Sequence, residues 1–337
     1  PVVSLGAMRS GNPRLITSGL DEGLKHLDTA HGYQNGRNEE MLGELLKGRP
    51  RDSFIIATKI HPRKKELSAE EFNEMFEISL KRLQMDYVDI LYLHGVSNKE
   101  TMMYDTHLNI LEKLKKQGKV RFTGVSTHTN MPEVIHAVVE SNFYDVVLTS
   151  YNFRMNNLPE MNEAIEKAAG SGIGIIAMKT MAGAFWDKEK TRPINTKAAL
   201  KWVLQNKNIH TTIPGATTFD ELADNLDVMC DISMSEQEVN DLNKHEELSG
   251  LFCSGCGKCI TECAKGLPVP DIMRAYMYAY GYKDLSLAKE VIEQQGLPDD
   301  PCRDCGVCTV HCPTGFDVAM KTRDIIRIRE IPDDFLA

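Results

Sequence analysis

Eight of the nine cysteines fall into two copies of one spacing, C-x2-C-x2-C-x3-C. The first copy spans residues 253–263, and the second spans residues 302–312 and is followed by Pro313. Four thiolates at this spacing are typical of [4Fe–4S] clusters, which carry single electrons. The alternatives are structural zinc, which usually binds two separated C-x2-C pairs, and disulfides, which suit short secreted chains.

The spacing also predicts which cysteines share a cluster. In two-cluster ferredoxins the fourth cysteine of each run ligates the other cluster. We therefore expect one cluster to be held by Cys253, Cys256, Cys259 and Cys312. The other would be held by Cys302, Cys305, Cys308 and Cys263. The ninth cysteine, Cys230, is expected to be an ordinary buried small residue.

A second set of reactive side chains lies in the first third of the chain: Asp28, Tyr33, Lys59 and His94. A free phenol has a pKa near 10, and a neighbouring ammonium lowers it by stabilising the phenolate. Asp28 would keep Lys59 charged and oriented, and His94 would hydrogen-bond at the same oxygen. Such a set suits the protonation of a carbonyl oxygen as hydride arrives at its carbon, or the reverse. The alternative is four unrelated polar residues at strand ends.

The elements that position these residues are eight short apolar runs separated by amphipathic stretches. The runs cover residues 2–8, 26–31, 54–60, 87–95, 120–127, 144–152, 172–180 and 209–217. Helical periodicity is clearest over 72–83, 131–139 and 200–204. Strands that are apolar throughout are buried on both faces and therefore parallel. Eight such units predict an α/β fold, a (β/α)8 TIM barrel, whose active site lies at the C-terminal ends of the strands. A doubly wound sheet is the alternative, but the chain has no G-x-G-x-x-G turn.

Several of these segments resemble one family in the correct order along the chain. The segment "HLDTAHGY" resembles the D-T-A-x-x-Y signature of aldo-keto reductases, and "ATK" and "YVDILYLH" match that family's Lys and His segments. "NEEMLGELL" is similar to its helix after the Tyr loop, and "IPGATTFDELADNL" to its eighth strand and following helix. The closest subgroup carries C-terminal ferredoxin-type clusters. The resemblance implies that Tyr33 is the proton donor, that Lys59 and Asp28 tune it, and that His94 orients the carbonyl.

The resemblance also implies a nicotinamide cofactor, NAD(P)(H). Ser126 and Asn152 would lie near the nicotinamide and substrate, and the strand end at Lys179 leads into a turn, 180–184, with Gly183 against the pyrophosphate. The residues along the adenosine would be Gly215, Thr217 and Asn225.

Three positions depart from the family pattern. Thr127 replaces the usual Asn, Leu148 aligns with the Gln that holds the carboxamide, and Met178 aligns with the aromatic that stacks on nicotinamide. These changes predict weak nicotinamide affinity. The stretch 215–225 has no Lys or Arg and carries three acidic residues, which favours NAD over NADP because a 2′-phosphate would find no cationic partner there.

Composition and charge limit the class of protein. With 42% hydrophobic and 26% charged residues the composition is that of a soluble globular protein, and no apolar run approaches the roughly 18 residues of a membrane span. The net charge of −9 argues against nucleic acid or anionic lipid as partner. Reduced thiolates fit a cytoplasmic location. The chain starts at Pro1 without an initiator Met, so we expect an upstream segment to have been removed, and a targeting signal there remains open.

The length of 337 residues favours more than one domain. We expect the barrel over 1–232, a linking helix over 233–250 that starts near Ser235 and stops at Gly250, and a cluster domain over 251–337. Residues 272–294 between the two cysteine runs are predicted to form a helical insertion with a Met/Tyr stripe. This stripe would pack on the clusters or the barrel, or dock an electron partner.

Three functions follow from these patterns. The first is an NAD(P)-dependent carbonyl/alcohol oxidoreductase whose clusters connect to an external electron carrier or are structural. The second is a redox enzyme in which the clusters feed electrons to another barrel-bound cofactor or substrate, because hydride transfer moves two electrons and a cubane moves one. The third is a non-catalytic sensor or binding subunit. A small carbonyl or alcohol substrate would meet His31, His128 and Arg154.

Overall fold

The computed structural model describes all residues except 63–66, 184, 186–190, 244–252, 304 and 337. The chain divides into two compact units. The first comprises Pro1–Met181 and Asn195–Leu242, and the second comprises Ala182–Ile194 and Asn243–Ala337. The domain boundaries expected from the sequence stay a prediction.

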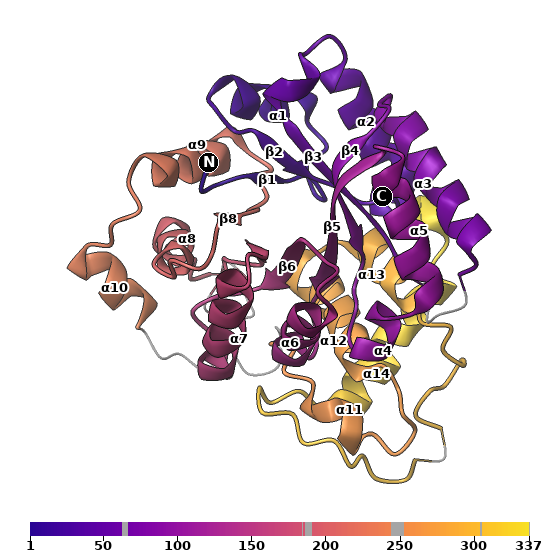
Figure 1. Cartoon of the computed structure of the whole chain (residues 1–337). Coiled ribbons are helices and arrows are strands. Elements are labelled where there is room, and N and C mark those ends of the chain that lie inside the picture. Colours follow the sequence, from indigo (N-terminus) through magenta and orange to yellow (C-terminus); the bar gives the residue numbers. More distant parts are fainter. Residues whose placement is uncertain (63–66, 184, 186–190, 244–252, 304, 337) are drawn as a thin grey trace. The chain divides into compact units, whose positions relative to one another are not determined.

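The first unit is built on eight parallel strands that pair in chain order (Figure 1). They are β1 (Leu5–Gly6), β2 (His26–Asp28), β3 (Ile55–Ile60), β4 (Val88–Leu93), β5 (Val120–Thr127), β6 (Val146–Ser150), β7 (Gly174–Met178) and β8 (Thr211–Thr212). The N–H of Ser4 donates to Thr212 O at 2.8 Å, and that of Gly6 donates to Pro214 O at 3.1 Å. These bonds join the last strand to the first, so the predicted (β/α)8 barrel is confirmed.

Helices follow the strands and cover the sheet. They are α1 (Pro13–Asp21), α2 (Arg37–Leu46), α3 (Ala69–Leu83), α4 (Lys99–Met102), α5 (Asp105–Lys116), α6 (Met131–Ser141), α7 (Leu158–Gly170), α8 (Thr196–Leu204), α9 (Phe219–Cys230) and α10 (Glu236–Leu242), with 3₁₀ turns η1 (Tyr33–Gly36) and η2 (Arg51–Ser53). Helix α3 begins at a capping box between Ser68 and Glu71 and buries Phe72, Phe76 and Leu80, one turn apart.

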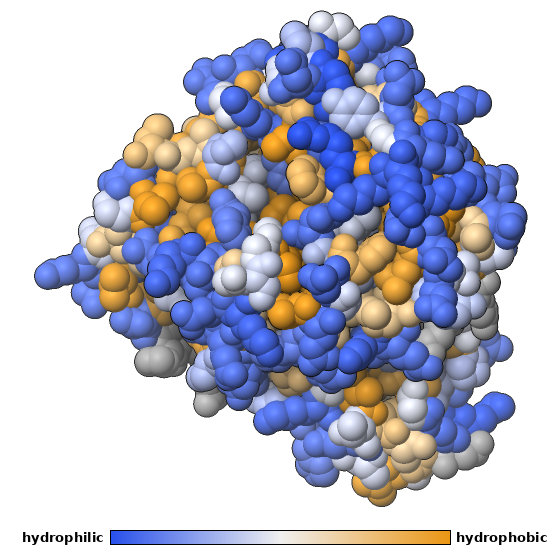
Figure 2. All heavy atoms as spheres, in the orientation of Figure 1, coloured by the Kyte–Doolittle hydropathy of each residue, from blue (hydrophilic) through white to orange (hydrophobic). Residues whose placement is uncertain are grey.

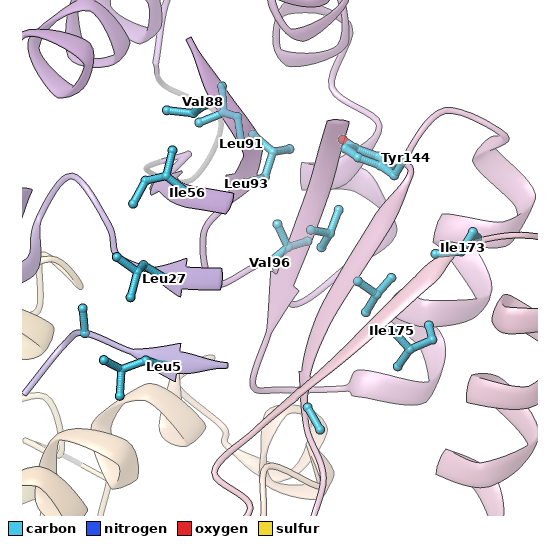
Figure 3. Close-up of a cluster of buried hydrophobic side chains, with 14 of the residues drawn as sticks. Leu5, Leu27, Ile56, Val88, Leu91, Leu93, Val96, Tyr144, Ile173 and Ile175 are labelled. Atoms are coloured by element: carbon cyan, nitrogen blue, oxygen red, sulfur yellow. The ribbon is translucent and has the colours of Figure 1, made fainter. Parts of the chain in front are cut away.

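The strands are buried on both faces, which is why their sequences are continuous apolar runs. Outward-facing residues such as Leu5, Leu27 and Ile56, on three consecutive strands, pack toward the helices (Figure 3). A separate cluster fills the barrel interior: Ala57, Ile90, Tyr92, Val146, Leu148, Ile176, Met178 and Ile213. Polar side chains dominate the face shown in Figure 2.

The terminal strands are shorter than the predicted runs. β1 pairs with β2 over two residues and β8 pairs with β7 over two residues. Beyond β8, Pro214 has no N–H to continue a ladder and contributes only its carbonyl, to Gly6. The apolar pattern therefore predicts the presence of these strands better than their length.

Asp89 of β4 is a buried acid that joins three neighbouring segments. Its carboxylate accepts from Arg51 at 2.7 Å, from Arg121 at 2.6 Å and from the N–H of Ile56 at 2.9 Å, and its side chain is 2% exposed. Loss of one partner of a buried ion pair leaves the other partners unsatisfied.

We therefore expect Asp89→Asn to lower the free energy of unfolding by about 3 kcal/mol. Anaerobic thermal unfolding followed by circular dichroism measures it. Glu112→Gln is the control, because Glu112 pairs with Lys116 on the surface of α5, where such pairs contribute less than about 0.5 kcal/mol. Equal melting temperatures for the two variants would contradict the structural role of Asp89.

The regular elements described in the second unit are helices, joined by irregular segments that carry most of the cysteines. Its elements are α11 (Lys258–Glu262), α12 (Val269–Tyr276), a π-helical turn η4 (Met277–Tyr282), α13 (Leu285–Glu293), α14 (Val318–Ile326), η5 (Arg327–Glu330) and η6 (Asp333–Phe335). Met273, Met277 and Tyr278 of the predicted stripe are buried in this unit's own core, on which several cluster cysteines also pack. Tyr280 of the stripe is 42% exposed.

The linking helix is described only in its first part. Ser235 and Glu238 bond each other's backbone N–H groups, and α10 follows Ser235 as expected. The rest of the predicted helix, to Gly250, falls largely on 244–252, outside the described residues. In the part of the chain that the structure covers, no helix combines the length and apolarity needed to cross a membrane.

Candidate functional site

The four residues expected to form the acid–base set meet at the C-terminal ends of β2, β3 and β4. Lys59 of β3 donates from Nζ to Oδ1 of Asp28 and, at 2.6 Å, to the carbonyl of Thr29. The same Nζ lies 3.5 Å from the hydroxyl oxygen of Tyr33 in η1. The ring of His94, just after β4, meets the Tyr33 ring edge-on with centroids 5.8 Å apart.

The ion pair beneath Tyr33 is withdrawn from solvent. The side chains of Lys59 and Asp28 are 2% and 3% exposed. Burial raises the pKa of the Asp28 carboxyl, while Lys59 opposes the shift. Burial lowers the pKa of the Lys59 ammonium, while Asp28 and then Glu39 oppose that shift. A cation held this close to a phenol in a water-poor site favours the phenolate.

The turn that carries Tyr33 is held by residues that the sequence analysis did not single out. Gln34 and Asn35 have φ of 54°, and Gly36 has φ of 91°. The φ of Gly36 favours glycine, and a Cβ there would also displace the Arg82 guanidinium, whose Cζ lies 2.2 Å from its position. Arg82 Nη1 donates to the carbonyl of His31 at 3.0 Å and to Glu39 at 3.4 Å. Glu39, within the "NEEMLGELL" segment, is fully buried and also accepts from Thr58 at 2.6 Å.

Two of the predicted nicotinamide contacts bond to neighbouring backbone. The hydroxyl of Ser126, which is fully buried, accepts from the N–H of Gly95 at 3.0 Å and so fixes the turn after His94. The amide of Asn152 donates to the carbonyl of Lys179 at 3.2 Å and accepts from the N–H of Arg154 at 3.0 Å. Lys179 itself has φ of 55°, in the left-handed region, where β7 leads into the next turn.

The predicted adenosine contacts lie in the loop after β8, which holds Gly215 and Thr217, and in α9, which holds Asn225. Both the N–H and the hydroxyl of Thr217 donate to the carboxylate of Glu221, at 2.7 and 2.9 Å. Asn225 is buried and donates to the carbonyl of Gly215 at 3.4 Å. Gly183 belongs to the second compact unit, and residue 184 is outside the described residues, so the pyrophosphate turn stays a prediction.

The three departures from the family pattern are buried side chains. Leu148 and Met178 belong to the cluster that fills the barrel interior. Thr127 is fully buried, and its hydroxyl donates to the carbonyl of Thr129 at 3.0 Å. Apolar packing therefore occupies two of the three positions at which the resemblance implies cofactor contacts.

The predicted substrate contacts are partly buried polar groups. His31 Nδ1 is 2.9 Å from the hydroxyl of Ser79, and His128 Nδ1 is 3.5 Å from that of Ser150. Burial lowers the pKa of the Arg154 guanidinium. All three follow barrel strands, at the same end as Tyr33.

The ligand set expected for the first cluster stays a prediction, and among the described residues no three potential ligands are gathered closely enough to hold a metal ion. Burial, together with the neighbouring Cys253, Cys256 and Cys312, raises the pKa of the Cys259 thiol to about 12. The electrostatic partners of Cys259 are thus the three residues expected to share its cluster. Four thiols that disfavour one another's ionisation suit a cationic iron centre, which binds thiolates.

A thiol of the second run also has cysteines of its own run as electrostatic neighbours. Burial raises the pKa of Cys302, with Cys305 and Cys308 among its neighbours, and Arg323 opposes the shift. Cys263 packs on the same hydrophobic core as Cys308. All nine cysteines are among the described residues and none forms a disulfide.

The expectation for Cys230 is wrong. It is exposed, not buried, because it is the last residue of α9 and follows the inward-facing Val228 and Met229. The helical position decides its exposure, since the apolar character of a thiol does not by itself bring a residue into the core.

Comparison with known proteins assigns both parts of the chain. Residues 13–198 match the model of the aldo/keto reductase family, and residues 252–320 match a 4Fe-4S dicluster domain. The L-galactose dehydrogenase of Arabidopsis thaliana is 27% identical over 261 residues, 67% of this chain and 80% of that protein. Methylglyoxal reductase DkgB of Salmonella typhi is 27% identical over 255 residues, 71% of this chain and 91% of that protein.

Solved structures show the same fold. The aldo-keto reductase AKR11C1 from Bacillus halodurans, in its holo form, superposes with a TM-score of 0.61 at 23% identity, over 75% of this chain and 95% of that one. An aldo-keto reductase from Klebsiella pneumoniae in complex with NADPH gives 0.58 at 22% identity, over 73% and 91%. The chain therefore belongs to the aldo/keto reductase family of oxidoreductase enzymes and carries a C-terminal 4Fe-4S dicluster domain.

Proposed function

We propose that the barrel catalyses the NAD(P)-linked interconversion of a carbonyl and an alcohol, with Tyr33 as general acid and base. The observation that carries the proposal is the buried Asp28–Lys59 pair, whose ammonium lies 3.5 Å from the Tyr33 hydroxyl. The four polar residues come from the ends of three strands, β2, β3 and β4. The arrangement also counts against a non-catalytic sensor.

Each member of the set has a distinct part in proton transfer. Tyr33 gives its proton to the carbonyl oxygen during reduction and takes it back during oxidation. Lys59 stabilises the phenolate that remains, and Asp28 holds Lys59 in place. His94 orients the carbonyl oxygen toward Tyr33. The nicotinamide supplies or accepts the hydride when bound.

The proposed substrate is a small, hydroxyl-rich or dicarbonyl compound. Two relatives are named for reactions of L-galactose and methylglyoxal, which are small and polar. In this chain Arg154, His128 and His31 offer hydrogen-bond donors at the same end of the barrel as Tyr33. Turnover of a panel of sugars and dicarbonyls with NADH and NADPH tests this class; no turnover of any member would contradict it.

The contacts of Glu221 lead us to propose NAD over NADP. Its carboxylate accepts both donors of Thr217 at the predicted adenosine edge, and such a carboxylate repels a 2′-phosphate. We expect NADH to bind at least about tenfold more tightly than NADPH, and both to bind weakly because Leu148 and Met178 offer no polar or aromatic contact.

Fluorescence titration of both nucleotides measures this preference. Glu221→Gln removes the charge and should narrow the gap between NADH and NADPH, whereas Glu236→Gln, on the exposed start of α10, should leave it unchanged. Equal affinities in the unaltered protein, or tight binding of either nucleotide, would contradict the inference.

A second candidate is a cluster-fed redox enzyme that uses another barrel-bound cofactor or substrate. It is favoured by the burial of Leu148 and Met178 in the barrel interior, at the positions where the resemblance to the family implies nicotinamide contacts. A carrier of single electrons and a two-electron hydride reaction need an intermediate that splits the pair.

Anaerobic purification separates the two candidates. Iron, sulfide, flavin and nicotinamide are quantified in one preparation. Stoichiometric flavin with negligible nicotinamide affinity would support the second candidate. Absence of flavin together with NADH-dependent turnover would support the first, with the clusters either structural or connected to an external electron carrier.

A further inference from the structure

Three buried polar atoms on β2 and β4, the strands on either side of β3, have no hydrogen-bond partner among the described residues. They are Nε2 of His26, Oδ2 of Asp28 and the hydroxyl oxygen of Tyr92. The residues are 4%, 2% and 0% exposed, so bulk water does not reach these atoms. The proposed reaction uses only the other oxygen of Asp28 and gives no part to His26 or Tyr92.

All three atoms surround the same ion pair. Tyr92 is the register neighbour of Lys59, and Lys59 Nζ lies 6.0 Å from the centre of the Tyr92 ring. Asp28 bonds that Nζ through Oδ1. His26 and Asp28 are two residues apart on β2, so their side chains share one face of the strand.

Each charge of the ion pair acts on one of the other two side chains, Asp28 on Tyr92 and Lys59 on His26. Burial raises the pKa of Tyr92 well above its usual value, and the charge of Asp28 raises it further. Burial lowers the pKa of His26 to about 4, with Lys59 acting in the same direction. His26 is therefore neutral and Tyr92 protonated near pH 7, and both offer hydrogen-bonding capacity without charge.

The Tyr92 ring occupies a space made by a glycine. Gly124 is its register neighbour on β5, and a Cβ there would lie 2.5 Å from the Tyr92 ring and 2.8 Å from the carbonyl of Val146. Any other residue at 124 would displace the ring. The orientation of the phenol in the barrel interior is thus fixed by the packing.

Buried polar groups are almost always hydrogen-bonded, and each one left without a partner costs about 1–3 kcal/mol. A single water molecule has two donors and two acceptors, and buried waters typically make about three bonds to such groups. A water would donate to Asp28 Oδ2, accept from the hydroxyl of Tyr92, and bond His26 as a third partner.

We propose that a structural water is bound in the barrel interior between Tyr92, Asp28 and His26, and that Tyr92 is a positioning residue for the Asp28–Lys59 pair. Through this water the hydroxyl of Tyr92 stabilises the carboxylate of Asp28, which in turn keeps Lys59 charged beneath Tyr33. The water site stands on the buried atoms alone, whereas the positioning role rests on the proposed function.

The first test is crystallographic and independent of activity. Tyr92→Phe removes only the hydroxyl. In the unaltered holoprotein at high resolution we expect a water within hydrogen-bond distance of Tyr92 Oη and Asp28 Oδ2, and in Tyr92→Phe we expect it to be lost or displaced. A dry interior, or a direct bond between Tyr92 and Asp28, would overturn the water site.

The second test is the pH profile of kcat/KM, with Tyr144→Phe as matched control. Tyr144 is also buried, and its hydroxyl donates to the carbonyl of Met102 at 2.6 Å, away from the ion pair. Loss of the donor to Asp28 raises the pKa of that carboxyl, so the acid limb of the profile should move to higher pH in Tyr92→Phe alone. Below the limb we expect about a tenfold loss of kcat with KM little changed.

Other titratable and charged groups around the pair stay the same in both variants. They are His26 on β2, Tyr33 on η1, Glu39 on α2, Lys59 on β3 and His94 after β4. Identical profiles for Tyr92→Phe and Tyr144→Phe would overturn the positioning role. If the unaltered protein turns over no carbonyl, the proposed function and the positioning role that rests on it both fail, and the crystal structures still decide the water.

Discussion

Tyr33→Phe is expected to lower kcat/KM for NADH-dependent carbonyl reduction by about 10²- to 10⁴-fold, the usual contribution of a positioned general acid. The variant removes the one hydroxyl that lies 3.5 Å from Lys59 Nζ and leaves the ring in its edge-on contact with His94. Binding of NADH should be unchanged, because no predicted nucleotide contact is altered. The loss should therefore appear in kcat more than in KM.

Steady-state kinetics and nucleotide titration on the same anaerobic preparation measure both quantities. Tyr104→Phe is the control, because Tyr104 is 36% exposed at the start of α5 and its ring, not its hydroxyl, packs against His107. It should turn over at the unaltered rate. Undiminished turnover in Tyr33→Phe would remove Tyr33 from its role and favour the cluster-fed candidate.

The barrel could be predicted from the sequence because its signal is local. Each strand reads as a short apolar run, since both of its faces are buried, and the helices between show a 3.6-residue period. The convergence of Asp28, Lys59 and His94 follows from the topology, because parallel strands in chain order bring their C-terminal ends to one edge.

What could not be predicted depends on packing between distant segments. Arg82 fixes the Tyr33 turn only because α3 brings it against Gly36 and Glu39. An arginine in a helix is usually solvent-exposed, so the sequence does not predict this contact. In the sequence Tyr92 looks like one more apolar residue of β4. The space that its ring occupies depends on Gly124 of the next strand. The bond that Ser126 accepts from the N–H of Gly95 is likewise invisible in the sequence, and its expected place at a cofactor stays a prediction.

Cys256→Ser is expected to remove one of two clusters, so iron and sulfide should fall from about eight of each per chain to about four. The serine oxygen is a poor substitute for a thiolate, and the three remaining thiols disfavour one another's ionisation without the metal charge. The brown absorbance should fall by about half, and one of two signals should disappear in electron paramagnetic resonance of the reduced protein. Cys230→Ser is the control, because Cys230 is exposed and lies in the first unit.

The same experiment can test whether the fourth cysteine of each run ligates the other cluster. Cys312→Ser should abolish the same resonance signal as Cys256→Ser, although Cys312 belongs to the second run, because Cys259 has Cys312 among its electrostatic neighbours. Cys263→Ser should abolish the other signal. If each run lost its own signal instead, the crossed ligation would be wrong. Carbonyl turnover in these variants then tests the role of the clusters. Rates that survive the loss of either cluster would mean that carbonyl reduction in the barrel and electron transfer through iron are separate activities of one chain.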